Sequence, residues 1–135
     1  MGVLIDSSVF IAIERAQLEL APYLDREDGA EYFLSVITAS ELVHGIHRAR
    51  DAGVRARRSA YVEGILERLP VLPLDLAAAR VHAQLSAHLA ARGTPIGPHD
   101  LWLAAACVAD GLSLATHNVR EFERVPGLQI EVWAG

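Results

Sequence analysis

The chain has 135 residues, a formal net charge of −5 and 52% hydrophobic residues, with few aromatic ones. This length and composition suit one folded domain, expected over residues 1–135, and exclude a disordered chain. No apolar run approaches the roughly 20 residues that span a bilayer, and the single cysteine, Cys107, excludes an intramolecular disulfide, so we expect a cytoplasmic protein that does not contact a membrane.

The first predicted strand leads directly into a carboxylate. Residues 3–5 form a short apolar run, typical of a strand that is buried on both faces, and Asp6, Ser7 and Ser8 follow at the start of a predicted helix. In open α/β sheets the ligand site lies beyond the carboxyl ends of the strands. Asp6 therefore occupies a position where functional groups are common.

Strands and helices alternate along the rest of the chain. Further strands are predicted at residues 32–34 with Val36 and Ile37, and at 71–74, 112–115 and 128–132. Helices are predicted between most of them: after Ile37, around 61–69, from Asp75 to near Gly93, over 98–110 with Pro98 at the first position, and from Asn118 to Phe122. This order predicts an α/β fold with a mostly parallel central sheet of about five strands, flanked by helices.

All twelve basic residues are arginines, and five of them lie between Arg48 and Arg58. The acidic total argues against non-specific binding to duplex nucleic acid, but it permits a local basic face. The cluster has two interpretations, a solvated helix surface or a rim that contacts phosphate or a partner protein, since the planar arginine fork suits phosphate and carboxylate alike. The sequence leaves both open.

Four polar residues stand out: Asp6, Glu41, Asp100 and Asn118. Each has a structural explanation when taken alone. Asp6 could cap a helix, Glu41 could be the fourth residue of a capping box that begins at Thr38, and Asp100 could favour the positive end of its helix dipole. Asn118 could cap the helix that contains Glu121 in the same way.

Together, these four residues predict a metal site. All lie at predicted helix starts, so the fold can bring three carboxylates and an amide to one edge of the sheet. Close carboxylates repel one another, and a divalent cation removes that repulsion. Oxygen-only ligands select a hard ion such as Mg²⁺, which can polarise a phosphoryl oxygen and activate a water molecule.

Five segments of the sequence resemble the PIN-domain ribonucleases, and within them the VapC toxins of bacterial type II toxin–antitoxin modules. The resemblance covers nearly the whole chain, and the segments follow one another in the order found in the family. The segments are residues 4–9, 38–45, 98–105, 109–116, and 118–122 with 126–128.

The resemblance implies a PIN-like α/β/α sandwich that holds Mg²⁺, or Mn²⁺, through acidic residues. Asp6 and Asp100 match the principal metal ligands of the family, and Glu41 matches the glutamate that coordinates the ion or orients water. Asn118 falls where many members carry a fourth acid, which favours one ion over two. Further polar residues in the matching positions, or beside them, are expected to contact phosphate or metal-bound water; they are Ser7, Thr116, His99 and His117.

The resemblance also implies an RNA substrate, such as a tRNA cut at an exposed loop, a VapB-like antitoxin that blocks the site, and a toxin homodimer. Two other functions remain possible from the sequence. One is a catalytically weak PIN module that binds RNA or a partner, favoured by Asn118 alone; the other is a PIN nuclease that matures RNA or cuts DNA outside toxin–antitoxin systems.

Overall fold

The computed structural model describes residues 2–16, 18, 22 and 29–133. Within them, five strands form one sheet in the order β3-β2-β1-β4-β5, and every neighbouring pair is parallel. The strands are β1 (Gly2–Ile5), β2 (Glu31–Ser35), β3 (Val71–Leu72), β4 (Ser113–Thr116) and β5 (Gln129–Val132). The predicted parallel sheet is therefore confirmed.

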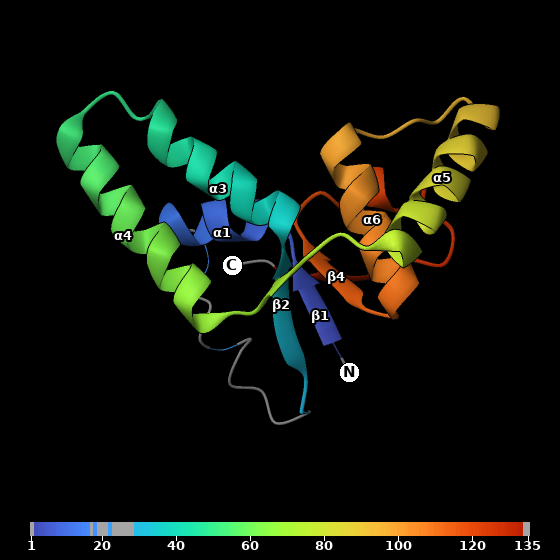
Figure 1. Cartoon of the computed structure of the whole chain (residues 1–135), viewed down its shortest axis with the longest axis horizontal. Coiled ribbons are helices and arrows are strands. Elements are labelled where there is room, and N and C mark those ends of the chain that lie inside the picture. Colours follow the sequence, from blue (N-terminus) through green and yellow to red (C-terminus); the bar gives the residue numbers. More distant parts are fainter. Residues whose placement is uncertain (1, 17, 19–21, 23–28, 134–135) are drawn as a thin grey trace.

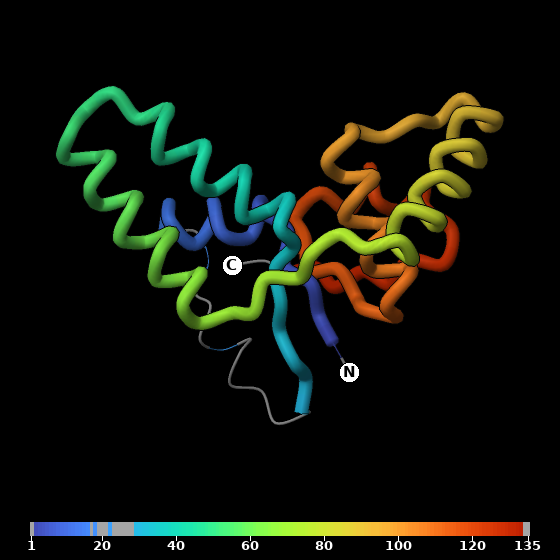
Figure 2. Tube along the Cα trace, viewed as in Figure 1, coloured from blue at the N-terminus to red at the C-terminus, as the bar shows by residue number. Residues whose placement is uncertain are grey.

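Helices cover both faces of this sheet. They are α1 (Ser7–Glu14), α3 (Val36–Arg48), α4 (Ala52–Arg68), α5 (Leu76–Ala91), α6 (Pro98–Asp110) and α7 (Val119–Phe122). Figure 1 shows α1, α3 and α4 on one side of the strands and α5 and α6 on the other. The segment between α4 and α5, which contains β3, crosses from one side to the other, as the tube in Figure 2 shows.

Alternating side chains of the central strands build a core on each face. Val3 and Ile5 of β1 pack into one cluster with residues of α1, α3 and α4, whereas Leu4 packs into a second cluster with residues of α5 and α6. In β4, Ala115 and Leu114 divide between the two clusters in the same way. Because successive side chains of a strand point to opposite faces, this division makes the fold an α/β/α sandwich.

Several predicted helix boundaries agree with the structure. The side chain of Asp75 caps α5 by accepting a hydrogen bond from the amide of Ala78 at 2.9 Å, and Pro98 occupies the first position of α6. Gly111, in the left-handed conformation with φ of 67°, ends α6. No helix in the described part of the chain is both long and apolar enough to cross a lipid bilayer.

The start of α3 corrects the prediction. Val36 and Ile37 belong to the helix and not to a strand, because Ser35 at the end of β2 takes the N-cap position and its hydroxyl accepts a hydrogen bond from the amide of Ile37 at 3.1 Å. Thr38 therefore lies inside the helix, and no capping box begins there. The local apolar pattern of residues 32–37 could not show this boundary, since it continues through the junction.

The cap at Ser35 should stabilise the protein, because it satisfies a helix amide at a buried junction between β2 and α3. We expect Ser35→Ala to lower the free energy of unfolding by about 1 kcal/mol and the melting temperature by about 4 °C, measured by thermal and urea denaturation. Ser40→Ala, at an exposed position of the same helix, is the control and should leave stability nearly unchanged. Equal effects of the two substitutions would contradict the assigned cap.

Candidate active site

Asp6 lies where β1 ends and α1 begins, and it is almost completely buried, with 4% of its surface exposed. Its amide donates to the carbonyl of Ala115 at 2.9 Å, which extends the pairing of β1 and β4 by one residue. Its Oδ2 accepts hydrogen bonds from the hydroxyls of Ser8 and Thr116, each at 2.8 Å. Asp6 occupies the N-cap position of α1, but its side chain makes no capping hydrogen bond. Its carboxylate is therefore oriented by hydroxyl groups rather than by the helix.

Glu41 reaches the same edge of the sheet from the second turn of α3. The prediction that it lies at a helix N-terminus is wrong, because the helix begins at Val36. Its Oε2 accepts a hydrogen bond from the hydroxyl of Ser7 at 3.3 Å, and its Oε1 lies 3.7 Å from Nδ1 of His99. Glu41 is thereby connected both to α1 and to the start of α6.

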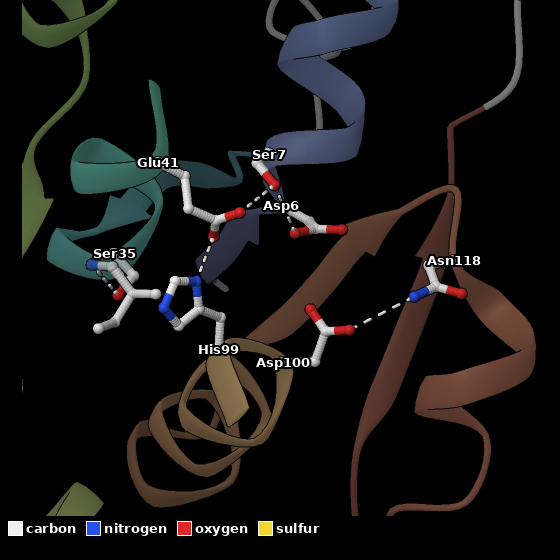
Figure 3. A network of polar contacts seen from close by, with 8 residues as sticks. Asp6, Ser7, Ser35, Glu41, His99, Asp100 and Asn118 are labelled. Atoms are coloured by element: carbon white, nitrogen blue, oxygen red, sulfur yellow. Dashed lines mark hydrogen bonds and ion pairs between the residues drawn. The ribbon is translucent and has the colours of Figure 1, made fainter. Parts of the chain in front are cut away.

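Asp100 and Asn118 approach from the other side of the site. Asp100 lies in the first turn of α6, and Asn118 precedes α7, both as predicted. Nδ2 of Asn118 donates to Oδ2 of Asp100 at 3.4 Å. The amide of Asn118 donates to the hydroxyl of Thr116 at 2.9 Å, so the end of β4 positions this residue as well as Asp6. Figure 3 shows the side chains of Asp6, Glu41 and Asp100 directed toward a common space, with Asn118 beside it.

Glu121 is a further residue of this site, although its sequence position indicated only a place in the helix that Asn118 could cap. Its Oε1 accepts a hydrogen bond from the amide of Gly97 at 2.7 Å, and its Oε2 accepts one from Nδ2 of Asn118 at 2.9 Å. Glu121 thus connects α7 to the N-cap of α6, the helix that carries Asp100. The spacing of three residues between Asn118 and Glu121 indicated that these two residues are in contact. It could not indicate the second contact, with Gly97.

The remaining predicted residues divide into two groups. Ser7 and Thr116 hydrogen-bond to the carboxylates, and His99 borders Glu41 with most of its side chain exposed. His117 does not join them: its amide donates to the hydroxyl of Ser8 at 3.1 Å, while its side chain is exposed and forms no hydrogen bond or ion pair with the described residues. Ser7, Thr116 and His99 therefore lie against the carboxylates of the site, whereas the side chain of His117 does not contact them.

The carboxylates of the site repel one another. Burial, followed by the charge of Asp6, a hydrogen bond and repulsion from Glu121, and the charge of Glu41, raises the pKa of Asp100 to about 7. Burial also raises the pKa of Glu41, against an opposing effect of His99. Hydrogen bonds from Gly97 and Asn118 lower the pKa of Glu121, so that group stays ionised. In the described part of the chain, no arginine pairs with Asp6, Glu41 or Asp100.

This set of ligands suits a hard divalent cation. The donors are carboxylate oxygens, they repel one another, and a bound cation would favour their charged forms. Among the described residues, no three histidine, cysteine, aspartate or glutamate side chains are arranged so that they could hold an ion by themselves. Mg²⁺ does not need such a cage, because it commonly takes one or two protein carboxylates and completes its shell with water and substrate phosphate.

A groove of about 330 Å³ adjoins the carboxylates. Ser7, Glu41 and His99 belong both to the site and to the lining of the groove, which continues between α1, α3 and α4. A ligand that reaches the carboxylates can therefore extend into this groove.

A family model and two relatives of known name are similar to this chain over most of its length. The family model of the PIN domain matches residues 3–128. The tRNA(fMet)-specific endonuclease VapC of Salmonella typhimurium is 43% identical over 100 residues, which are 74% of this chain and 74% of that protein. Ribonuclease VapC5 of Mycobacterium tuberculosis is 38% identical over 118 residues, 87% of this chain and 82% of that protein.

A solved structure shows the same fold. The crystal structure of DNA-bound VapBC from Salmonella typhimurium contains a chain with a TM-score of 0.88 and 34% sequence identity, and the match covers 99% of both chains.

The repulsion among the carboxylates predicts a pH-dependent stability. Because the folded state raises the pKa of Asp100 from its usual 3.8 to about 7, the folded protein binds this proton more tightly than the unfolded chain does. The resulting stability is present below the usual pKa and is lost as the pH rises through 7. In protein free of divalent ions, Asp100→Asn should therefore raise the melting temperature by about 3 to 5 °C at pH 8 and change it little near pH 4.

Differential scanning calorimetry in EDTA measures this effect. Asp110→Asn removes the same charge from an exposed position of the same helix and is the matched control. A melting temperature at pH 8 that Asp100→Asn does not raise above that of the control would contradict the repulsion.

Proposed function

Because this chain belongs to the PIN-domain family, and within it to the VapC ribonucleases, we propose that it is a metal-dependent endoribonuclease that acts as the toxin of a toxin–antitoxin pair. The observation that carries the proposal is the set of three carboxylates at the carboxyl edge of the sheet, with Asp6 buried and oriented and no arginine among the described residues to neutralise them. A single PIN domain over residues 1–135 carries the activity, in the cytoplasm where its RNA substrate is found.

Asp6 and Asp100 are the principal ligands of Mg²⁺ or Mn²⁺ in this proposal. The hydroxyls of Ser8 and Thr116 hold Asp6 so that its remaining lone pairs face the site. When bound, the ion would polarise a phosphoryl oxygen of the substrate and acidify a water molecule. Asn118 contributes position rather than charge, through its hydrogen bond to Asp100, which favours one tightly held ion.

Glu41 has a different role, which is to orient the attacking water. Its Oε2 is occupied by the hydrogen bond from Ser7, so its Oε1, beside His99, is the atom available to receive a proton from that water. The raised pKa of Glu41 supports this role, because a general base works best when its pKa approaches the working pH.

The relatives suggest the substrate and the partner. The Salmonella typhimurium relative is named for tRNA(fMet), so we propose initiator tRNA as the substrate to test first. Sequence-specific RNA recognition usually targets single-stranded loops, because duplex RNA hides its base edges in a deep groove. The solved VapBC complex supports a VapB-like antitoxin as the partner that neutralises this chain. We also propose that this chain forms a homodimer.

Asp6→Asn tests the nuclease directly. The amide has the same shape and can still accept a hydrogen bond, so the protein should fold, but cleavage of a tRNA(fMet) transcript should fall at least about 100-fold because a ligand charge is lost. Cleavage is measured by gel analysis of new 5′ ends, and growth arrest on induction should disappear in parallel.

The matched control for this loss is Asp110→Asn, an exposed aspartate at the end of α6, which should cleave like the wild type. Full activity of Asp6→Asn would contradict the assignment. If the wild-type protein binds the transcript without cutting any RNA, the chain is a binding module instead.

Removal of metal gives an independent test. EDTA should abolish cleavage, and Mg²⁺ or Mn²⁺ should restore it. The same ions should raise the melting temperature of the wild type at pH 8, because they bind the folded state and relieve the repulsion at Asp100. The thermal effect should be lost in Asp100→Asn; a rise that persists in this variant would place the ion elsewhere.

A further inference from the structure

The groove beside the carboxylates differs in charge from the rest of the chain. Among the described residues, its charged lining side chains are three arginines, Arg15, Arg48 and Arg58, and two glutamates, Glu14 and Glu41. These five residues sum to a positive charge, although the whole chain carries −5. If Glu41 serves the metal site, the balance becomes more positive still.

The arginines near this groove fall into two classes. Arg58 serves the fold: it donates to the carbonyl of Gly45 at 3.1 Å and pairs with Glu14 at 3.3 Å, which neutralises that glutamate. Arg55, outside the groove, likewise donates to the carbonyl of Ala49 with two of its nitrogens.

Arg15 and Arg48 are different. Both are exposed, and neither makes a hydrogen bond or ion pair with the described residues. Their guanidinium groups are therefore available to a ligand, in contrast to those of the structural arginines.

Two helices lead from the carboxylates to these free arginines. Along α1, Arg15 follows Ser7 by eight residues, about 12 Å at 1.5 Å per residue; along α3, Arg48 follows Glu41 by seven residues, about 10 Å. Measured along the chain, the two arginines therefore lie at similar distances from the site, Arg48 at the end of α3 and Arg15 directly after α1, and both line the groove.

We propose that Arg15 and Arg48 bind the backbone phosphates of the RNA strand on one side of the cleavage position, so that the groove is the path by which single-stranded RNA enters the site. This inference rests on the nuclease function proposed above. Arginine suits phosphate because its planar fork can donate two parallel hydrogen bonds to one anion.

Other residues of the groove fit a single strand. Tyr61 lines it, held by a hydrogen bond from its hydroxyl to the carbonyl of Phe10 at 2.6 Å, and Ile11 contributes an exposed apolar surface. Aromatic and apolar surfaces beside arginines are typical of sites for single-stranded RNA, because bases and riboses pack on them while phosphates contact the cations.

Binding of a labelled single-stranded RNA of about 12 nucleotides, within the range of known site sizes, tests the proposal. Asp6→Asn serves as the background so that no cleavage occurs during fluorescence anisotropy between about 50 and 200 mM KCl. Adding Arg15→Gln and Arg48→Gln should weaken binding about tenfold and reduce the slope of log K against log salt by about 1.4, or 0.7 for each lost phosphate contact.

Two matched variants isolate the groove. Arg80→Gln with Arg92→Gln removes the same charge from exposed positions at α5, on the other face of the sheet, and should change affinity less than about twofold. Arg15→Lys with Arg48→Lys keeps the charge and should retain the salt slope of the parent. Thermal unfolding of all variants verifies that they are folded.

The outcomes separate this proposal from the nuclease assignment. Equal weakening by the groove pair and the α5 pair, or an unchanged salt slope in the groove pair, would overturn the groove as an RNA site. If the groove pair leaves RNA affinity unchanged but abolishes binding of a co-expressed antitoxin, the groove is a site for a protein partner and not for RNA. Cleavage by the wild-type protein is measured separately. If the wild type cuts RNA but the groove substitutions do not weaken RNA binding, the nuclease function stands and only the groove as the path of the RNA is rejected.

Discussion

The geometry of the candidate active site depends on one buried carboxylate, that of Asp6, where β1 ends beside β4. A carboxylate out of water is stable only where hydrogen-bond donors replace its hydration, and Ser8 and Thr116 supply them to Asp6 at 2.8 Å. One donor comes from α1 and the other from β4, so the same contacts fix the start of that helix and the end of that strand. The adjoining Asn118 amide donates to Thr116, and the position of the second half of the site follows from it.

The site is organised but not neutralised. Hydrogen bonds position Glu41, Asp100 and Glu121, yet burial and mutual repulsion raise the pKa of Asp100 and Glu41. Nearby arginines could have relieved this repulsion, but Arg55 and Arg58 donate to carbonyls near the end of α3. Among the described residues, no arginine pairs with the carboxylates of the site. A folded protein that keeps like charges together loses stability, and such losses are typical of sites that bind a cation and react.

An acidic protein that acts on RNA must separate its charges in space. The negative groups collect at the carboxyl edge of the sheet, where a cation can bind, and the groove between α1, α3 and α4 carries the free arginines. Because interactions between exposed charges weaken beyond about 8 to 10 Å at physiological salt, a local basic groove can attract phosphate despite a net charge of −5. In our proposal, the substrate bridges these two regions.

Local sequence patterns determined much of this molecule. The apolar run before Asp6, the cap at Asp75 and Pro98 at the start of α6 each depend on neighbouring residues alone, and they predicted a five-stranded parallel sheet that the structure confirms. The same patterns predicted that Asp6 and Asn118 lie at one edge of the sheet, because the carboxyl ends of parallel strands meet there.

Tertiary structure alone decided the contacts that join distant segments. Glu121 meets Gly97 across 24 residues, and Arg58 meets Glu14 across 44, so no local pattern could assign either partner. The start of α3 was also misplaced, because the apolar run through Val36 and Ile37 suits a strand and a buried helix start equally well. Local propensity specifies which elements form; packing decides which of their polar side chains remain free to act.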